Sequence, residues 1–136
     1  MAVIARTKAS IRFFGNDLIP DEVTLLLGCE PTFKHQKGEV LVGRNTGKSR
    51  VAKTGLWRLE AIEAEPGDLD NQIEDILSRL TNDMDVWSDL VGRYEVDLFC
   101  GLFMDSGMEG IGISAENLRL LGDRGVEIGF DIYGPE

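Results

Sequence analysis

Apolar and polar residues alternate in several stretches of this 136-residue chain, and the alternation predicts strands. In the clearest stretch Val126, Ile128, Phe130 and Ile132 are separated by polar residues or glycine. A period of two places successive side chains on opposite faces, so such a strand buries one face. The pattern predicts strands at residues 9–14, 39–42, 55–61, 95–104, 111–114 and 126–133.

Apolar residues spaced three or four apart predict helices. The strongest stripe starts after Pro66-Gly67-Asp68 and contains Leu69, Ile73, Ile76, Leu77 and Leu80, with acidic residues on the opposite face. It is typical of a helix packed on a sheet. Another helix is predicted from about residue 85 to 91.

Two shorter helices are predicted from their start and stop signals. The first begins near Asp17 or Pro20 and the second at Ser114, which can accept a hydrogen bond from a free backbone amide. We expect them to end at Gly28 and Gly122, because glycine takes the left-handed conformation without a Cβ penalty.

The order of these elements predicts an α+β fold. It is expected to be a two-layer sandwich, with an antiparallel or mixed sheet and the helices on one face. Residues 20–28 and 114–122 agree at one glutamate, two leucines and the last glycine. Either the chain contains an internal duplication of a strand-helix-strand unit, with ferredoxin-like character, or two short units share a stop signal by coincidence.

The length fits a single domain over residues 1–136, and about two thirds of the unfolded surface would be buried on folding. No apolar run approaches the roughly 20 residues that cross a bilayer, and no secretory signal is evident. We therefore expect a cytoplasmic protein without membrane contact. Cys29 and Cys100 are then expected to be reduced thiols.

The formal net charge of −10 argues against general nucleic-acid binding, which requires excess Lys and Arg. The charge is unevenly distributed, however. Residues 32–58 contain seven basic residues and one acid, so this segment carries +6 and the remainder carries −16. Its basic loop, at about residues 32–55, is glycine-rich and weakly patterned, which is typical of a functional or mobile segment.

The basic loop has two interpretations. Its cations could pair with the acidic surface of the same molecule, or they could form a site for an anion or an acidic partner. In the second case Trp57 would form one wall of the site. The candidate ligand-binding residues are Lys34, His35, Lys37, Arg44, Lys48, Arg50, Lys53 and Trp57.

Signals for catalysis, metals and cofactors are weak. The segment Gly43 to Ser49 has three residues between its glycines, whereas a phosphate-binding P-loop has four. The acids between Asp68 and Asp75 lack the order of a calcium loop and are expected on a solvated helix face. His35 is the single histidine, and no nucleophile motif is evident. We predict no catalytic residue, metal or cofactor.

Several segments carry a family resemblance: residues 18–22 and 27–31, Lys37-Gly38-Glu39, Trp57-Arg58-Leu59, residues 113–122 and the closing Asp131-Ile132-Tyr133. Together they resemble the bacterial family labelled domain of unknown function 4279. The resemblance covers almost the whole chain and implies a small α+β protein. It implies no catalytic residues and no activity.

The expected function is a non-catalytic module that binds a protein partner, for example as an inhibitor or immunity-type factor. The alternative is a domain that binds or senses a small anionic metabolite through the basic loop. An enzyme is the third possibility, without a reaction class. These hypotheses follow from the lack of catalytic groupings and from the divided charge.

Overall fold

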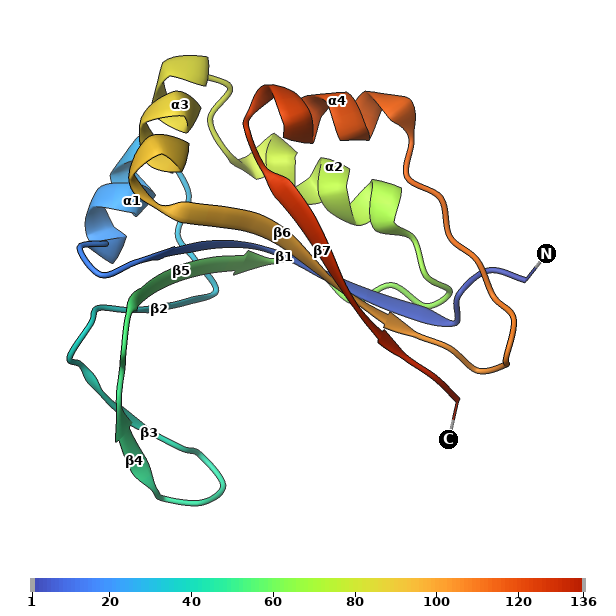
Figure 1. Ribbon diagram of the computed structural model, residues 1–136, viewed down its shortest axis with the longest axis horizontal. Coiled ribbons are helices and arrows are strands. Elements are labelled where there is room, and N and C mark those ends of the chain that lie inside the picture. The colour runs from blue at the N-terminus through green and yellow to red at the C-terminus, as the bar shows by residue number, and fades with distance from the viewer. Residues whose placement is uncertain (1, 136) are drawn as a thin grey trace.

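The computed structural model describes residues 2–135, which form a five-stranded sheet, a separate two-stranded hairpin and four helices (Figure 1). All four helices lie on one side of the sheet, as predicted. The elements are β1 (Arg6–Gly15), α1 (Pro20–Leu27), β2 (Phe33–His35), β3 (Val40–Val42), β4 (Ser49–Val51), β5 (Gly55–Glu60), α2 (Leu69–Arg79), α3 (Met84–Arg93), β6 (Glu95–Phe103), α4 (Ala115–Asp123) and β7 (Glu127–Tyr133).

The sheet has the strand order β2-β5-β1-β6-β7 and is mixed. The central strand β1 is antiparallel to both neighbours, with Phe13 opposite Trp57 on β5 and Val96 on β6. The last strand, β7, is parallel to β6. The sequence prediction of an α+β fold with a mixed sheet is therefore confirmed.

The core lies between the helices and one face of the sheet. The rings of Phe13 and Trp57 meet edge to face at 5.4 Å, and Phe13 lies 6.0 Å from Trp87 of α3. All three rings are almost fully buried. Burying a side chain such as Phe13 contributes about 1.5–3 kcal/mol, so this aromatic cluster anchors the helix layer.

Helix α2 matches its predicted bounds and packs its apolar stripe on β1. Asp68 caps the helix by accepting a hydrogen bond from the Asn71 amide at 3.1 Å. The one buried polar residue in its stripe, Gln72, donates to the Thr7 carbonyl at 3.0 Å and accepts from the Thr7 hydroxyl at 2.8 Å. The buried amide is thus satisfied by β1.

One of the two predicted glycine stops is confirmed. Gly28 has a φ of 77° and ends α1. Gly122, in contrast, lies inside α4, and Gly125 adopts the left-handed conformation with a φ of 75°. The prediction at Gly122 was wrong because a helix tolerates one glycine and the tight turn into β7 occurs three residues later.

Two further predictions need correction. Residues 111–114 form no strand, since that segment is extended chain leading to α4 and only Gly110 makes a bridge, to Val3. The first strand was predicted to begin at residue 9, but β1 already begins at Arg6. Arg6 pairs with Phe103 on β6, so the longer partner strand extends β1.

The two units of the predicted duplication occupy different positions in the sheet. In β6-α4-β7 the two strands are adjacent and parallel. In β1-α1-β2 the strands are separated by β5. A shared ancestry of the two units stays a prediction.

The basic loop contains a hairpin, which the sequence only partly indicated. β3 and β4 pair antiparallel, with Val40 opposite Val51, and project away from the helices (Figure 1). Backbone hydrogen bonds of 2.8 Å and 2.9 Å from Ala52 to Glu39 and from Gly38 to Ala52 close its base. Within residues 2–135, no helix is long and apolar enough to cross a membrane.

Candidate functional site

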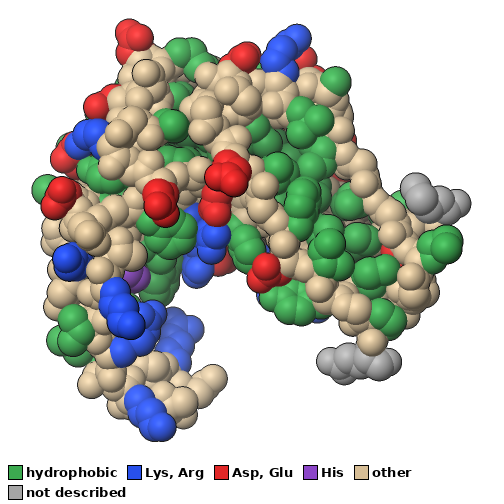
Figure 2. All heavy atoms as spheres, viewed as in Figure 1, with side chains coloured by type: hydrophobic (Ala, Val, Ile, Leu, Met, Phe, Trp, Pro, Cys, Tyr) green, Lys and Arg blue, Asp and Glu red, His purple; other side chains and the backbone are tan. Residues whose placement is uncertain are grey.

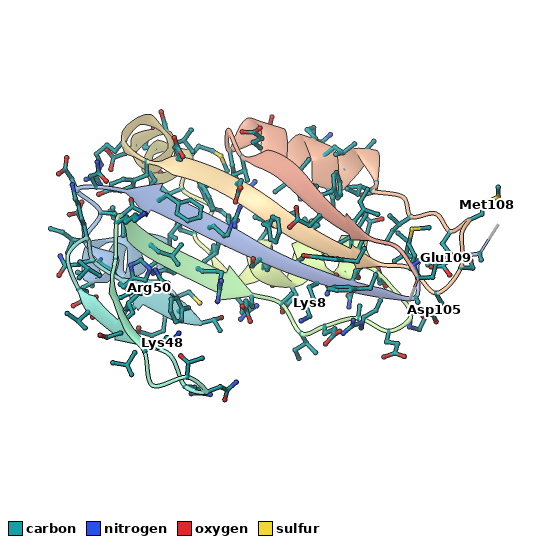
Figure 3. All side chains as sticks on the ribbon, turned by 60° about the horizontal axis from the view of Figure 1, so that its bottom comes forward. Lys8, Lys48, Arg50, Asp105, Met108 and Glu109 are labelled. Atoms are coloured by element: carbon teal, nitrogen blue, oxygen red, sulfur yellow. The ribbon has the colours of Figure 1, made fainter. Side chains whose placement is uncertain are left out.

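A concave surface lies between the β3–β4 hairpin and the side of the sheet that carries no helix. We call this side of the sheet the open face. Figure 2 shows the hollow, with Lys and Arg side chains gathered on the hairpin that borders it. Figure 3 places Lys48 and Arg50 on the hairpin, and Lys8 on β1, in a view that brings the open face forward.

Strand alternation determines which side chains reach the open face. Ile11 and Phe13 of β1 face the helices, so Lys8, Arg12 and Phe14 face the other way. The same alternation places Arg58 of β5 and Asp97 of β6 opposite Arg12. A row of charged and aromatic side chains therefore crosses the middle of the open face.

Arg12 is held in place at the centre of this row. Its Nε and Nη2 donate to the two carboxylate oxygens of Asp97 at 2.9 Å and 2.7 Å. The guanidinium also lies over the rings of Phe99, at 4.3 Å, and Phe14, at 5.0 Å. The hydrogen bonds to Asp97 raise the pKa of Arg12. The Arg12 guanidinium is therefore held in one position on the open face, and its charge is neutralised by Asp97.

Arg58 is a second neutralised cation on the open face. Its Nε lies 3.2 Å from Oε1 of Glu60, but the alignment does not meet hydrogen-bond geometry, so the contact is an ion pair only. The guanidinium also lies 5.1 Å from the centre of the Phe33 ring on β2. Arg12 and Arg58 are thus both paired with acids of the sheet itself.

Lys8 differs from these arginines because it is exposed and makes no ion pair with any residue in the range 2–135. Its Nζ lies 5.6 Å from the centre of the Phe103 ring. Sequence reasoning missed Lys8 and Arg12. The alternation of Lys8, Ser10, Arg12 and Phe14 with buried Ala9, Ile11 and Phe13 was the signal for them.

The hairpin and its base carry the largest group of free cations. Within residues 2–135 five of the predicted site residues are exposed and form no ion pair: Lys37, Arg44, Lys48, Arg50 and Lys53. The interpretation that the loop cations pair with the protein's own acidic surface is therefore wrong for these five. The hairpin projects away from the helices (Figure 1).

Lys34 does follow that interpretation. It lies opposite Trp57 on the helix side of β2 and pairs with Asp21 of α1 at 3.1 Å. Both side chains are well exposed, so this pair contributes little stability. Lys34 faces away from the concave surface and does not join the other cations.

The base of the hairpin forms a hollow of about 490 Å³, which is lined by Phe14, His35, Arg50, Lys53 and Leu56, with Val51 and Thr54. The structure thus brings together three of the predicted site residues: His35, Arg50 and Lys53. His35 is buried and its ring meets Phe33 edge to face at 5.8 Å, while its Nδ1 has no hydrogen-bond partner in the described chain.

Trp57 lies outside this site. Its ring is fully buried on the helix side of β5, and its Nε1 donates to the Thr24 hydroxyl of α1 at 3.0 Å. A bound ligand on the open face cannot reach it. The prediction of Trp57 as a wall of the site is wrong, because β5 turns this position towards the core, where it serves as a packing anchor.

A larger hollow, of about 560 Å³, lies at the far end of the sheet beside Arg6, Phe103, Asp105 and Tyr133. Its one cation, Arg6, is already paired with Glu63 at 2.6 Å and lies 4.0 Å over the Phe103 ring. This hollow offers an anion no free positive charge, so the hairpin end is the better candidate site.

Two of the acidic residues of α2, Asp70 and Asp75, have structural partners. Asp70 accepts hydrogen bonds from the Ser114 amide at 2.9 Å and from the Asn117 amide group at 2.7 Å. Asp75 pairs with Arg79 one helical turn later. Within residues 2–135, no three His, Cys, Asp or Glu side chains are grouped so that they could hold a metal ion.

The described chain offers little nucleophilic chemistry near the basic surface. The turn from Gly43 to Lys48 closes a hairpin and is not followed by a helix, so it does not form a P-loop. Cys29 and Cys100 are free thiols. Cys100 is fully buried, and burial raises its pKa to about 12, so it stays protonated at neutral pH.

Comparison with known families gave a match over residues 5–135 to DUF4279, described as a domain of unknown function. Comparisons with curated proteins and with solved structures gave no significant match. The family match covers nearly the whole chain and agrees with the resemblance seen in the sequence. The chain belongs to the DUF4279 family.

Proposed function

We propose that this protein is a non-catalytic module that binds an acidic protein partner on the hairpin and the adjoining concave surface. The observation that carries the proposal is the group of five exposed cations without ion-pair partners in residues 2–135. They are Lys37, Arg44, Lys48, Arg50 and Lys53.

The charge distribution supports an acidic partner. Residues 32–58 carry +6 on a protein whose remainder carries −16. A basic surface opposed to the molecular average attracts an acidic partner and orients it as it approaches, while the acidic remainder repels other binding modes. The module would act by occupying a surface of its partner, as inhibitors and immunity-type factors do.

The apolar side chains of the hairpin support a protein partner over a small molecule. Val40, Val42 and Val51 share one face of the hairpin, since Val40 is opposite Val51 and the side chains alternate. Their exposed fractions are 62%, 66% and 59%. Arg50, opposite Leu41, lies on the other face of the same hairpin, so the hairpin presents an apolar face and a cationic face. A protein partner is large enough to contact both faces, whereas a small molecule is not.

The test compares capture of host proteins by the immobilised chain and by the variant Arg50→Glu. Arg119→Glu on α4 is the matched control, because it changes the net charge equally on the exposed helix side. We expect a defined partner to be retained by the chain and by the control. Its affinity for Arg50→Glu should fall at least tenfold, since a like charge at an interface costs several kcal/mol.

The alternative function, binding of a small anion, is supported by the hollow that brings His35, Arg50 and Lys53 together. It makes a different prediction for the same variant. If inorganic phosphate or a small carboxylate raises the unfolding temperature of the chain, and Arg50→Glu removes that effect while protein capture is unaffected, the alternative replaces the first proposal. A partner bound with equal affinity by the unchanged chain, by Arg50→Glu and by Arg119→Glu would contradict the first proposal directly.

A further inference from the structure

The outer edge of β7 is an unpaired and largely apolar strand edge within residues 2–135. β7 ends the strand order of the sheet, at the edge opposite the hairpin. Phe130 and Ile132 are 44% and 64% exposed, and Tyr133 is 48% exposed. Figure 2 shows hydrophobic side chains gathered on the side of the molecule where β7 lies in Figure 1. Such an edge is a template for pairing with another strand.

The free backbone groups of this edge belong to alternate residues. The Tyr133 carbonyl accepts a hydrogen bond from Met104 at 3.0 Å and so faces inward, towards β6. By alternation the inward residues are 127, 129, 131 and 133. The N–H and C=O groups of Ile128, Phe130 and Ile132 therefore face outward.

We propose that a second copy of this chain pairs with that edge, β7 against β7, antiparallel about a two-fold axis at Phe130. The amino-acid pattern of the strand supports this register. The register places Phe130 opposite Phe130 of the copy and Ile128 opposite Ile132 of the copy. The outward N–H and C=O groups of these residues then bond to one another across the axis.

Charge excludes the neighbouring registers. An axis at Gly129 would place Glu127 opposite Asp131 of the copy, and an axis at Asp131 would place two Asp131 side chains together. Like charges directly opposite each other destabilise a strand pair. The axis at Phe130 instead places Asp131 opposite Gly129 and Glu127 opposite Tyr133. Of these three registers, only the axis at Phe130 joins apolar residues and separates the acids.

The dimer leaves the proposed partner-binding surface free, because the hairpin lies at the other edge of the sheet. It does not rest on the proposed function. The two sheets would form one continuous sheet across the axis, with a hairpin at each far end. Each dimer would then present two copies of the basic surface.

Analytical ultracentrifugation of the full chain in 0.15 M salt tests the dimer, since repulsion between the acidic copies is screened there. The weight-average mass should rise with protein concentration from 15.0 kDa towards twice that value. Phe130→Glu should hold the mass at 15.0 kDa by placing two carboxylates together on the axis. Leu25→Glu, at an 84% exposed position on α1, is the matched control and should still dimerise.

Cysteine cross-linking tests the register in a Cys29→Ser, Cys100→Ala background, because Cys100 on β6 is opposite residue 130 within the same chain and would otherwise compete for it. Phe130→Cys should form a covalent dimer on mild oxidation, because directly opposite Cα atoms about 5.5 Å apart suit a disulfide. Ile132→Cys should not, because it faces Ile128 of the copy. A chain that stays monomeric at all concentrations, a dimer unaffected by Phe130→Glu, or cross-linking through residue 132 would overturn the proposal.

Discussion

Asp70 shows how a single carboxylate fixes the position of a helix. It lies in the first turn of α2 and accepts hydrogen bonds from the backbone amide of Ser114, the cap of α4, and from the side chain of Asn117. Burial raises the pKa of Asp70, but the hydrogen bonds from Ser114 and Asn117 outweigh this effect and lower the pKa below its ordinary value. α4 is therefore held to α2 by an ionised group.

Asp70→Ala should destabilise the domain by about 1–2 kcal/mol, because the backbone amide of Ser114 and the side-chain amide of Asn117 both lose a hydrogen-bond acceptor. For a domain of this size that lowers the unfolding midpoint by roughly 3 to 12 °C. Thermal unfolding at pH 7 measures the effect, with Glu74→Ala on the exposed side of the same helix as the control.

The effect should depend on pH in a defined direction. A carboxylate whose pKa is lowered by folding stabilises the folded state above its unfolded pKa of about 3.9, and this contribution is lost as the pH falls through the folded value. The difference between the chain and Asp70→Ala should be full at pH 6 and shrink below about pH 4. An equal difference at pH 6 and pH 3 would contradict the ionised linkage.

Single residues could be assigned to the core from sequence, but their contacts with other elements could not. The apolar residues of α2 were predicted to pack on a sheet, and they are buried, whereas Trp57 was predicted at the binding site and is buried in the core. The side to which Trp57 points follows from its pairing with Phe13, which no local pattern specifies. The partners of Asp70 lie 44 and 47 residues away, which is beyond any local signal.

At the scale of elements, long periodic segments were predictable and short ones depended on tertiary contacts. The stripe of α2 and the alternation of β6 and β7 correspond to observed elements. β2, β3 and β4 have three residues each and exist through pairing, so their own sequences carry weak signals. The end of α4 was misplaced because both Gly122 and Gly125 are residues of the type that ends helices. Of the two, only Gly125 adopts the left-handed backbone conformation.

The hairpin should be separable from the domain. Replacing Val40–Val51 by Asn-Gly would join Glu39 to Ala52, which are already hydrogen-bonded at 2.8 Å, through a turn that favours hairpins. The removed residues are nearly all exposed, so the unfolding midpoint should change by only a few degrees. Circular dichroism and thermal unfolding measure this. Loss of the folded domain would show that the hairpin supports the core.

At the scale of the whole molecule, charge and topology act together. In residues 2–135 the helix layer carries acidic groups and the hairpin carries free cations, whereas the open face between them carries both signs (Figure 2). Strand register places on it the acids Glu60, Glu95, Asp97, Glu127 and Asp131 beside the cations Lys8, Arg12 and Arg58. Counting charged residues along the sequence located the basic segment, but it did not show that this segment borders the open face of the sheet. Lys8 and Arg12 reach that surface because β1 lies at the centre of the sheet, and Lys34 is excluded because β2 turns it to the helix side. Strand order and facing, rather than composition, decide the members of the site.

Site-specific photo-cross-linking in the producing cells tests the central claim most directly. A photoreactive residue at Val42 on the hairpin is compared with one at Leu118 on α4, and both positions are exposed. We predict a discrete cross-linked partner with an acidic surface from position 42, weakened by Arg50→Glu, and none from position 118. No product from position 42, or a product unaffected by the charge reversal, would contradict the assignment of the basic hairpin as the binding surface.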